Sequence, residues 1–411
     1  MNALAGESHG RRGHDARSRA RSRDRRVYLL SHPVLFTLLA VTRRWPARRL
    51  GRTVLAHSGT AVRDGLTRVP LDRTAAGTTG GAAGDLTGGD LLFNQDGDGH
   101  RGARRGLGLD ADGVERLRPV WMSVLDRRLE PLANGGRIEL VDVTAEMAGA
   151  TAAALLGVDV DPLALAAAAR EAAAAGAREH LPGIRRPGAH RAASAATARL
   201  TALLAGSAAA AVSSPGESGS AAGVASSPGA AGSAAGDASS PGAAGSAAGD
   251  AALATMLAVA AINTTVAALP RAAAWCADDD LWSFADTDPE ALTSEILRVT
   301  APTPLLPRVA AGSGTIDGCP VHPGDRLILV ARHAVDAHRA GPCPADPAPA
   351  HVAQLVFGAG PHACPGARLA RHQLSDALRA LAVHRPRVVS ARVDRRAALP
   401  GWSRLILEPT R

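Results

Sequence analysis

The chain of 411 residues contains no lysine, because all 46 of its basic residues are arginine. This absence excludes mechanisms that need a lysine amine, such as Schiff-base chemistry or the lysine of a phosphate-binding loop. Aromatic residues are also scarce, with four Phe, five Trp and one Tyr, and base stacking on nucleic acids needs aromatic faces. Four cysteines are too few for a disulfide scaffold in a chain of this length.

Positive charge is present but unevenly distributed. The formal net charge is +8, and residues 1–52 hold 13 arginines against three acidic residues, so the remainder is close to neutral. We interpret residues 1–26 as a basic, flexible tail and residues 27–411 as a single domain. An arginine-rich terminus is usually a solvated tail, and we expect no nucleic-acid partner.

The apolar segment 27–41 follows a pair of arginines, as the hydrophobic part of a signal peptide does. It contains Ser31, His32 and Pro33, however, and it leads into further arginines rather than a small-residue cleavage site. We interpret it as the start of a helix in a cytoplasmic protein. No other segment reaches the length of a continuous apolar span, so we expect no membrane association.

Helical periodicity dominates the chain beyond the tail. Apolar residues between 117 and 125 have helical spacing, and this pattern ends at Asn134-Gly135-Gly136. A second pattern runs from about Thr144, which we expect to be its N-cap, to Gly157. The alanine-rich segment 163–205 and residues 251–275 are also expected to be helical. Residues 315–330 instead read as strands separated by Asp-Gly and Pro-Gly turns. The sequence therefore predicts a mainly α fold with a small β portion.

Residues 213–251 consist of a repeated unit of thirteen residues. Its copies are SSPGESGSAAGVA followed by SSPGAAGSAAGDA twice. A segment so rich in Ser, Pro, Gly and Ala buries too little apolar surface to offset the entropy lost on ordering. We interpret residues 206–250 as a flexible, low-complexity insertion between two helices.

The most informative stretch is FGAGPHACPG, from Phe357 to Gly366, followed at once by a helical apolar pattern. A cysteine just before a helix faces the free N–H groups of the first turn, which favour the thiolate. Such a sulfur can ligate a metal or act as a nucleophile. A dinucleotide-binding reading of Gly358, Gly360 and Ala363 would need an acidic residue at the end of a second strand, but Asp376 falls inside the helical pattern.

This decapeptide resembles the cysteine-ligand loop of the cytochrome P450 superfamily, in which Phe, two Gly, His or Arg, Cys and Gly stand at these spacings. Further signals follow upstream in family order: Glu295-Ile-Leu-Arg298, Thr264-Thr265, and His100-Arg-Gly-Ala-Arg104. The resemblance covers roughly residues 90–410. It implies the haem-thiolate fold, haem b as cofactor, and a monooxygenase activity supplied with electrons by a separate ferredoxin and ferredoxin reductase.

The resemblance also assigns roles to individual residues. Cys364 is expected to ligate the iron. Other residues expected to contact the haem or its propionates are His100, Arg104, Ala261, Arg308, Phe357, Gly360, His362 and Gly366. His100 and Arg104 lie four residues apart, so one face of a helix presents both.

The distal helix departs from the family pattern. By family position Thr264 and Asn263 are the expected catalytic residues. At Ala260-Ala261-Ile262-Asn263-Thr264 the hydroxyl of Thr264 is kept, whereas Asn263 replaces the usual acid and Ala261 the usual glycine. An amide does not carry protons as a carboxylate does. We therefore consider three functions: hydroxylation that relies on water and Thr264, oxidative coupling without oxygen insertion, and haem binding or sensing without turnover.

Glu295 and Arg298 resemble the family's structural ion pair. The family usually adds an arginine in the following meander, yet none lies between Arg339 and Arg368, and residues 342–349 look shortened. A third partner is therefore missing or supplied in another way.

Substrate contacts are expected from four regions by family position: Gly77–Phe93, Ala260–Ala261, Thr303–Leu306 and Leu399–Trp402. These regions are mostly small or apolar, which favours a hydrophobic small molecule such as a natural-product intermediate. By analogy, arginines near Cys364, such as Arg368 and Arg371, would help an acidic ferredoxin to dock.

Overall fold

The computed structural model describes residues 19–78, 80–81, 84, 92, 95, 97–180, 187–213 and 241–410. Residues 1–18 of the predicted tail, residues 214–240 of the predicted insertion and most of the glycine-rich loop before Phe93 lie outside the described residues.

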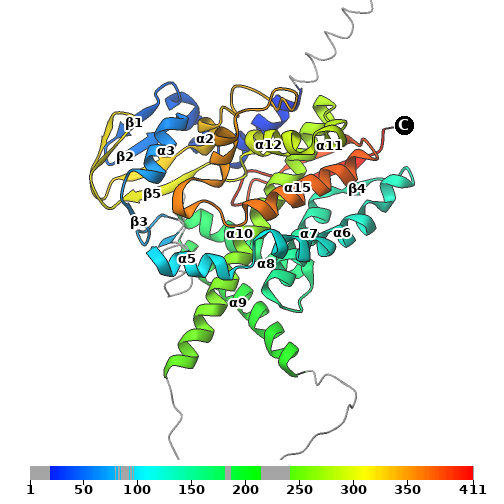
Figure 1. Cartoon of the computed structure of the whole chain (residues 1–411), viewed down its shortest axis with the longest axis horizontal. Coiled ribbons are helices and arrows are strands. Elements are labelled where there is room, and N and C mark those ends of the chain that lie inside the picture. The colour runs from blue at the N-terminus through cyan, green and yellow to red at the C-terminus, as the bar shows by residue number, and fades with distance from the viewer. Residues whose placement is uncertain are drawn as a thin grey trace, which may run out of the picture.

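Helices make up most of the described chain (Figure 1). A helix at residues 19–31 precedes the labelled ones. The longer helices are α2 Pro33–Thr42, α3 Gly59–Thr67, α5 Gly97–Gly106, α6 Ala111–Ala133, α7 Leu140–Leu156, α8 Pro162–His180, α9 Ala189–Ser213, α10 Pro241–Asp279, α12 Pro289–Thr300 and α15 Ala367–Ala382. Short helices are α11 Phe284–Thr287, α13 Ala331–Ala334 and α14 Ala350–Ala353, with 3-10 turns η1 Gln354–Phe357 and η2 Gly360–His362.

Three small sheets complete the described fold. The first has the strand order β1-β2-β8-β5-β3, the second β4-β10-β9, and β6 pairs with β7. All pairs are antiparallel except β2 with β8. The strands are β1 Ala47–Leu50, β2 Thr53–Ala56, β3 Leu71–Asp72, β4 Ile138–Glu139, β5 Leu306–Ala310, β6 Gly314–Ile316, β7 Cys319–Val321, β8 Arg326–Leu329, β9 Arg387–Val393 and β10 Trp402–Glu408.

The helix α10 runs through the middle of the molecule, with the first sheet on one side and α6, α7 and α8 on the other (Figure 1). It contacts α7, α8, α9, α12 and α15. Residues 249–279 of this helix are long enough to span a membrane and contain an apolar window of 18 residues whose mean hydropathy is 1.8. This corrects the expectation that no further segment reaches that length. In this fold half of that apolar window is buried against neighbouring helices, as the core position of α10 requires.

Several sequence predictions are confirmed. The fold is mainly α with a small β portion, and α6 buries Trp121, Val124 and Leu125 before ending at Asn134. The turn at Asp317-Gly318, where both residues have positive φ, connects β6 to β7. Positive φ at Gly157 ends α7, since a residue without Cβ adopts the left-handed conformation without strain.

The predicted start of α7 is wrong. The helix begins at Leu140, where the side chain of Glu139 accepts a hydrogen bond from the N–H of Val141. Thr144, the predicted cap, lies one turn inside the helix and donates its hydroxyl proton to the carbonyl of Leu140. Thr is among the residues preferred at the N-cap and Glu is not, so the sequence favours Thr144 over Glu139.

The flexible tail does not extend to residue 26, because residues 19–31 form a helix. Its Asp24 is buried and accepts hydrogen bonds from Arg271 on α10, at 2.6 and 3.1 Å, and from Arg332, at 2.9 Å. The local sequence of the arginine-rich segment does not predict these ion pairs, because their partners lie more than 240 residues away. The insertion is likewise shorter than 206–250, since α9 continues to Ser213 and α10 begins at Pro241.

A cluster of three histidines includes His57, directly after β2, and His333 on α13. His57 Nδ1 is 2.8 Å from His333 Nδ1, and the rings of His333 and His338 are 4.7 Å apart. Burial lowers the pKa of His57 and His338 to about 4 and that of His333 to about 2, and the neighbouring histidines and Arg43 add to the effect. The folded protein therefore keeps the cluster neutral at pH 7.

We expect the free energy of unfolding to fall as the pH is lowered from about 6.5 toward 4. In this range the histidines bind protons in the unfolded chain but stay neutral in the folded cluster. The free energy of unfolding therefore falls by at most about 1.4 kcal/mol per pH unit for each histidine. Urea unfolding between pH 7.5 and 4.5 measures this. His338→Phe removes one of the three titrating groups, and it breaks no hydrogen bond at Nδ1, which has no partner among the described residues. The free energy of unfolding of this variant should therefore fall less steeply with pH. An equally steep fall would show that His338 does not contribute to the pH dependence.

Candidate active site

A cavity of about 330 Å³ lies between α10, α5, β5 and the loop before α15. Apolar side chains and small residues form most of its wall, and Cys364 and several basic residues supply its polar groups. The polar set consists of Arg73, Thr78, His100, Arg104, Thr264, Thr265, Thr303, Arg308, His362, Cys364 and Gln373. Segments far apart in the sequence therefore meet in one pocket.

The loop before α15 folds back on itself and presents Cys364 to this cavity. The N–H of Cys364 donates to the carbonyl of Phe357 at 2.8 Å, and the N–H of Ala363 donates to Gly360. Gly358 and Gly360 both have positive φ, +79° and +73°. A Cβ on Gly360 would also lie 3.3 Å from the methyl group of Thr67. The backbone of the turn thus requires glycine at positions 358 and 360.

The Cys364 sulfur faces the cavity, so its side chain is accessible there although protein surrounds it. Burial raises the pKa of the thiol, while a backbone hydrogen bond from Gly366 and the charge of Arg104 lower it. The sequence predicted that the helix N-terminus would favour the thiolate. In the protein alone, burial raises the pKa of the thiol by more than the helix N-terminus lowers it. A metal cation bound to the sulfur would stabilise the thiolate here.

Three predicted haem contacts lie together beside the loop. The rings of His100 on α5 and His362 are stacked with 3.9 Å between their centroids, and His100 is buried. Arg104 donates from Nη1 to the carbonyl of Ala363 at 2.5 Å and to that of Pro361 at 3.1 Å. The guanidinium therefore fixes the cysteine loop itself, a contact that the i, i+4 spacing did not reveal.

Arg308 lies on β5 with its guanidinium buried against the cavity. It donates to the carbonyl of Pro307, and no carboxylate among the described residues pairs with it. Burial lowers its pKa to about 10, and the positive charge of Arg73 contributes. A buried cation without an acidic partner is costly and indicates a site for an anionic group.

Arg73 is a cavity residue that sequence reasoning missed. The β3–β5 register pairs Asp72 with Val309, and continuing it by one residue brings Arg73 opposite Arg308. No local pattern marks it, because the strand pairing alone places it there.

The distal helix α10 presents Ala261, Thr264 and Thr265 to the cavity. The hydroxyl of Thr264 donates to the carbonyl of Ala260 at 2.8 Å, and that of Thr265 to Ala261. Asn263 does not line the cavity, contrary to its predicted place beside Thr264. Its amide donates to the carbonyls of Val259 and of Ala169 on α8, because one residue of helix rotates a side chain by about 100° away from the cavity face.

The buried pair Glu295 and Arg298 anchors the segment behind the site. Arg298 donates to both carboxylate oxygens, at 2.8 and 2.6 Å, and to the carbonyls of Val335 and Gly341. The Glu295 carboxylate also accepts the N–H groups of Cys343 and Ala348. Backbone groups thus replace the missing meander arginine. Burial alone would raise the pKa of Glu295, but these donors hold it below its usual value.

Asp376 has a structural role. Its carboxylate accepts hydrogen bonds from the indole N–H of Trp121 and from Arg118 on α6. It lies within α15 and not at the end of a strand, so the dinucleotide-binding reading fails on its geometry.

The expected substrate regions divide into two groups. Thr78, Gly80, Leu92, Ala260, Ala261, Thr303 and Leu306 line the cavity. Residues Leu399–Trp402 do not; Trp402 begins β10 and lines a separate surface trough. The lining of the cavity therefore does not support the predicted contacts from Leu399–Trp402.

No family model and no curated protein matches the sequence of this chain. Solved structures do match its fold. Ligand-free CYP164A2 from Mycobacterium smegmatis is 22% identical and has a TM-score of 0.68, with 94% of this chain and 100% of that chain covered. A mutant of P450 EryK from S. erythraea in complex with erythromycin B is 19% identical, with a TM-score of 0.66 and coverage of 92% and 97%. The Orf6* (CYP165D3) monooxygenase involved in teicoplanin biosynthesis is 21% identical, with a TM-score of 0.63 and coverage of 90% and 96%.

The molecule has a mainly α architecture around a cavity, and Cys364 lies on the wall of that cavity. This architecture matches the three solved structures over nearly their whole length, which shows that the chain has the cytochrome P450 fold. The resemblance first indicated by the decapeptide around Cys364 is therefore confirmed at the level of the fold.

The P450 fold implies a haem cofactor, and the residues present fit one. Cys364 offers a soft sulfur donor suited to iron, and Arg308 is a buried cation on the same cavity without an acidic partner among the described residues. A porphyrin with two propionates needs both kinds of group.

Proposed function

We propose that this protein is a haem-thiolate monooxygenase that oxidises a hydrophobic small molecule with O2. Cys364 would hold the iron of haem b, and His100, Arg104, Arg308 and His362 would hold its propionates, with Arg73 added to the set. The observation that carries the proposal is the placement of two groups on one largely apolar cavity: the Cys364 sulfur, and the Arg308 guanidinium, which has no acidic partner among the described residues.

Haem with a thiolate ligand supplies electron density that favours O–O bond cleavage. The chain supplies the rest. The apolar wall excludes water from the reacting centre, and Ala261 leaves room on the distal helix where a larger side chain would intrude. The Thr264 hydroxyl lies on this wall and can turn from the Ala260 carbonyl to hold a proton donor.

The position of Asn263 bears on the choice among the three functions considered. Its amide is engaged with α8 and α10, so it does not interfere with Thr264, and proton delivery rests on Thr264 and water. This arrangement favours oxygen insertion over coupling. Mass spectrometry of product formed under isotopically labelled O2 distinguishes the two, because a coupling product gains no labelled oxygen.

The substrate is proposed to be an apolar natural-product intermediate. The cavity wall is largely apolar, and two of the similar structures are a complex with erythromycin B and an enzyme of teicoplanin biosynthesis. Electrons would come from ferredoxin and its reductase in the cytoplasm. Arg368 is exposed for such docking, whereas Arg371 is occupied with Gln354 and the ring of Phe357.

The test of this function is substrate-library turnover with a surrogate ferredoxin and reductase. Substrate-dependent consumption of reducing equivalents with labelled product supports the monooxygenase. Pigmented protein that consumes none with any compound would instead support the haem-binding or sensing function.

For Thr264→Ala we expect electron use to become uncoupled from product formation, with haem content unchanged. Loss of the hydroxyl removes a proton-delivery group but no haem contact, so product per reducing equivalent should fall by about 100-fold, the low end of typical general acid–base effects. The control is Thr265→Ala, which removes the neighbouring cavity hydroxyl. If Thr265→Ala uncouples the reaction and Thr264→Ala does not, the role belongs to the other residue.

For Arg308→Leu we expect two effects of opposite sign. Haem affinity should fall by about 10- to 100-fold, since a hydrogen bond to a charged group contributes about 1.5–3 kcal/mol. The haem-free protein should be as stable as the original or more so, because the variant lacks a buried cation that no described carboxylate pairs with. Haem titration and urea unfolding measure the two, with exposed Arg116→Leu as control. A destabilised apoprotein would show that Arg308 is structural.

A further inference from the structure

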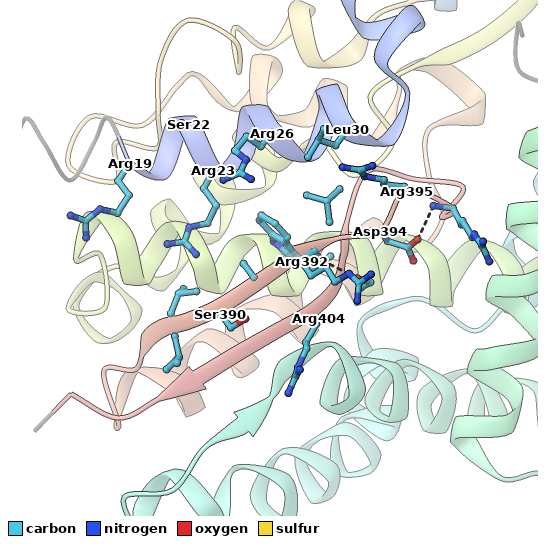
Figure 2. A pocket seen from close by; sticks show the side chains of 17 residues that line it. Arg19, Ser22, Arg23, Arg26, Leu30, Ser390, Arg392, Asp394, Arg395 and Arg404 are labelled. Carbon is cyan, nitrogen blue, oxygen red and sulfur yellow. Dashed lines mark hydrogen bonds between the residues drawn. The ribbon is translucent and has the colours of Figure 1, made fainter.

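A second large depression lies away from the haem cavity and shares none of its lining residues. This arginine trough is a surface groove of about 1510 Å³ between the helix at residues 19–31 and the β9–β10 hairpin (Figure 2). It exceeds the roughly 300–1,000 Å³ of a small-molecule site, so its size favours a segment of a macromolecule.

The charge of the trough is strongly unbalanced. Seven of its 17 lining residues are arginines and one is acidic: Arg19, Arg23, Arg26, Arg392, Arg395, Arg396 and Arg404 against Asp394. Arg23 pairs with Asp278, and Asp394 binds Arg170 and two backbone N–H groups. The other six arginines are exposed and have no ion pair among the described residues. Such a concentration of one charge attracts an acidic ligand.

One wall of the trough is an open strand edge. In the sheet β4-β10-β9, β9 is the last strand, and no other described strand pairs with its free side. Residues 388–393 of β9 all line the trough, with the basic helix facing them (Figure 2). An unpaired edge presents a row of N–H and C=O groups to an extended peptide, and natural sheets usually protect such edges.

We propose that the arginine trough binds an acidic, extended segment of a partner protein, which adds to β9 as a fourth strand. The arginines supply charge complementarity, and Leu30, Val388, Val389 and Val393 supply apolar contacts between them. Nucleic acid fits less well, because the trough has one aromatic lining residue, Trp402, which is only 4% exposed and cannot stack on bases. Residues 1–18 do not complement the trough either, since they are more basic than acidic.

Fluorescence anisotropy on the full chain tests this, with a fluorescein-labelled peptide of four Glu-Val repeats at 150 mM salt, about physiological ionic strength. We expect saturable binding that Arg392→Glu/Arg396→Glu weakens by about tenfold or more, the effect of losing about 1.4 kcal/mol. The control is Arg63→Glu/Arg116→Glu, which makes the same charge change at exposed arginines on α3 and α6. It should alter the affinity by less than about threefold, because charges farther than about 8 Å from the peptide are screened.

A second measurement leaves the protein unaltered. The same peptide with N-methyl groups on alternate backbone nitrogens keeps its charge but loses the strand hydrogen bonds, and it should bind at least about tenfold more weakly. The proposal is overturned if the parent peptide does not bind, if the N-methylated peptide binds equally well, or if single-stranded DNA of equal charge binds more tightly. Neither measurement depends on the proposed haem chemistry.

Discussion

Replacing Cys364 by alanine should yield a protein that has lost most of its haem and whose reduced form with carbon monoxide lacks the absorption band of thiolate ligation. The sulfur is the cavity's one cysteine donor, and loss of even an outer-shell partner of a metal ligand typically costs 10- to 100-fold in affinity. We therefore expect haem retention to fall by more than about 100-fold and turnover to be undetectable. Haem titration and the carbon monoxide spectrum of reduced protein measure this.

The matched control is Cys319→Ala, a half-buried cysteine on β7 outside the cavity. Its spectrum should equal that of the original protein. Haem-free Cys364→Ala should remain folded, because Cys364 contributes little apolar burial and its backbone bond to Phe357 persists. Full pigmentation of Cys364→Ala with an unaltered spectrum would refute the proposed ligand and, with it, the proposed function.

The second large effect is expected for Glu295→Ala. It leaves the buried Arg298 guanidinium without its carboxylate and strips the acceptor from the N–H groups of Cys343 and Ala348. Breaking a buried ion pair by removing one partner costs about 3–5 kcal/mol. Urea unfolding at pH 7.5 should show this loss, and the haem-free protein should show it too, because the pair lies behind the cavity.

The double variant Glu295→Leu/Arg298→Leu separates the ion pair from its backbone network. Many buried pairs can be replaced by apolar residues with little loss. Here four backbone groups would be left without partners, so the double variant should stay destabilised by about 2 kcal/mol or more. The control is Arg339→Ala, which breaks the exposed pair with Asp336 and should cost less than about 1 kcal/mol. A fully stable double variant would show that the backbone contacts contribute little.

The loop around Cys364 was predictable residue by residue from the sequence. Its glycines are needed for positive φ at Gly358 and Gly360, and its cysteine precedes α15, so the local chemistry is encoded in ten consecutive positions. The buried face of α6 was predictable for a similar reason, since helical spacing alone places Trp121 and Leu125 on one side.

Contacts between distant segments were not predictable in this way. The missing meander arginine left a gap that backbone groups of Val335, Gly341, Cys343 and Ala348 fill. Asn263 had a predicted catalytic place, but packing of α10 on α8 directs its amide to Ala169. Neither outcome follows from spacing, because each depends on which neighbour happens to lie opposite.

By itself, the sequence determined the mainly α class, the cysteine loop and the hydroxyl of the distal helix, because these depend on local periodicity, turn geometry and a short motif. Tertiary structure alone decided that Arg73 lies beside Arg308, that Asp24 orders part of the basic tail, and that no described strand covers the outer edge of β9 beside seven arginines. The physical reason is that electrostatic and strand-edge interactions act across space, and the order of residues along the chain does not state which charges or edges will face each other.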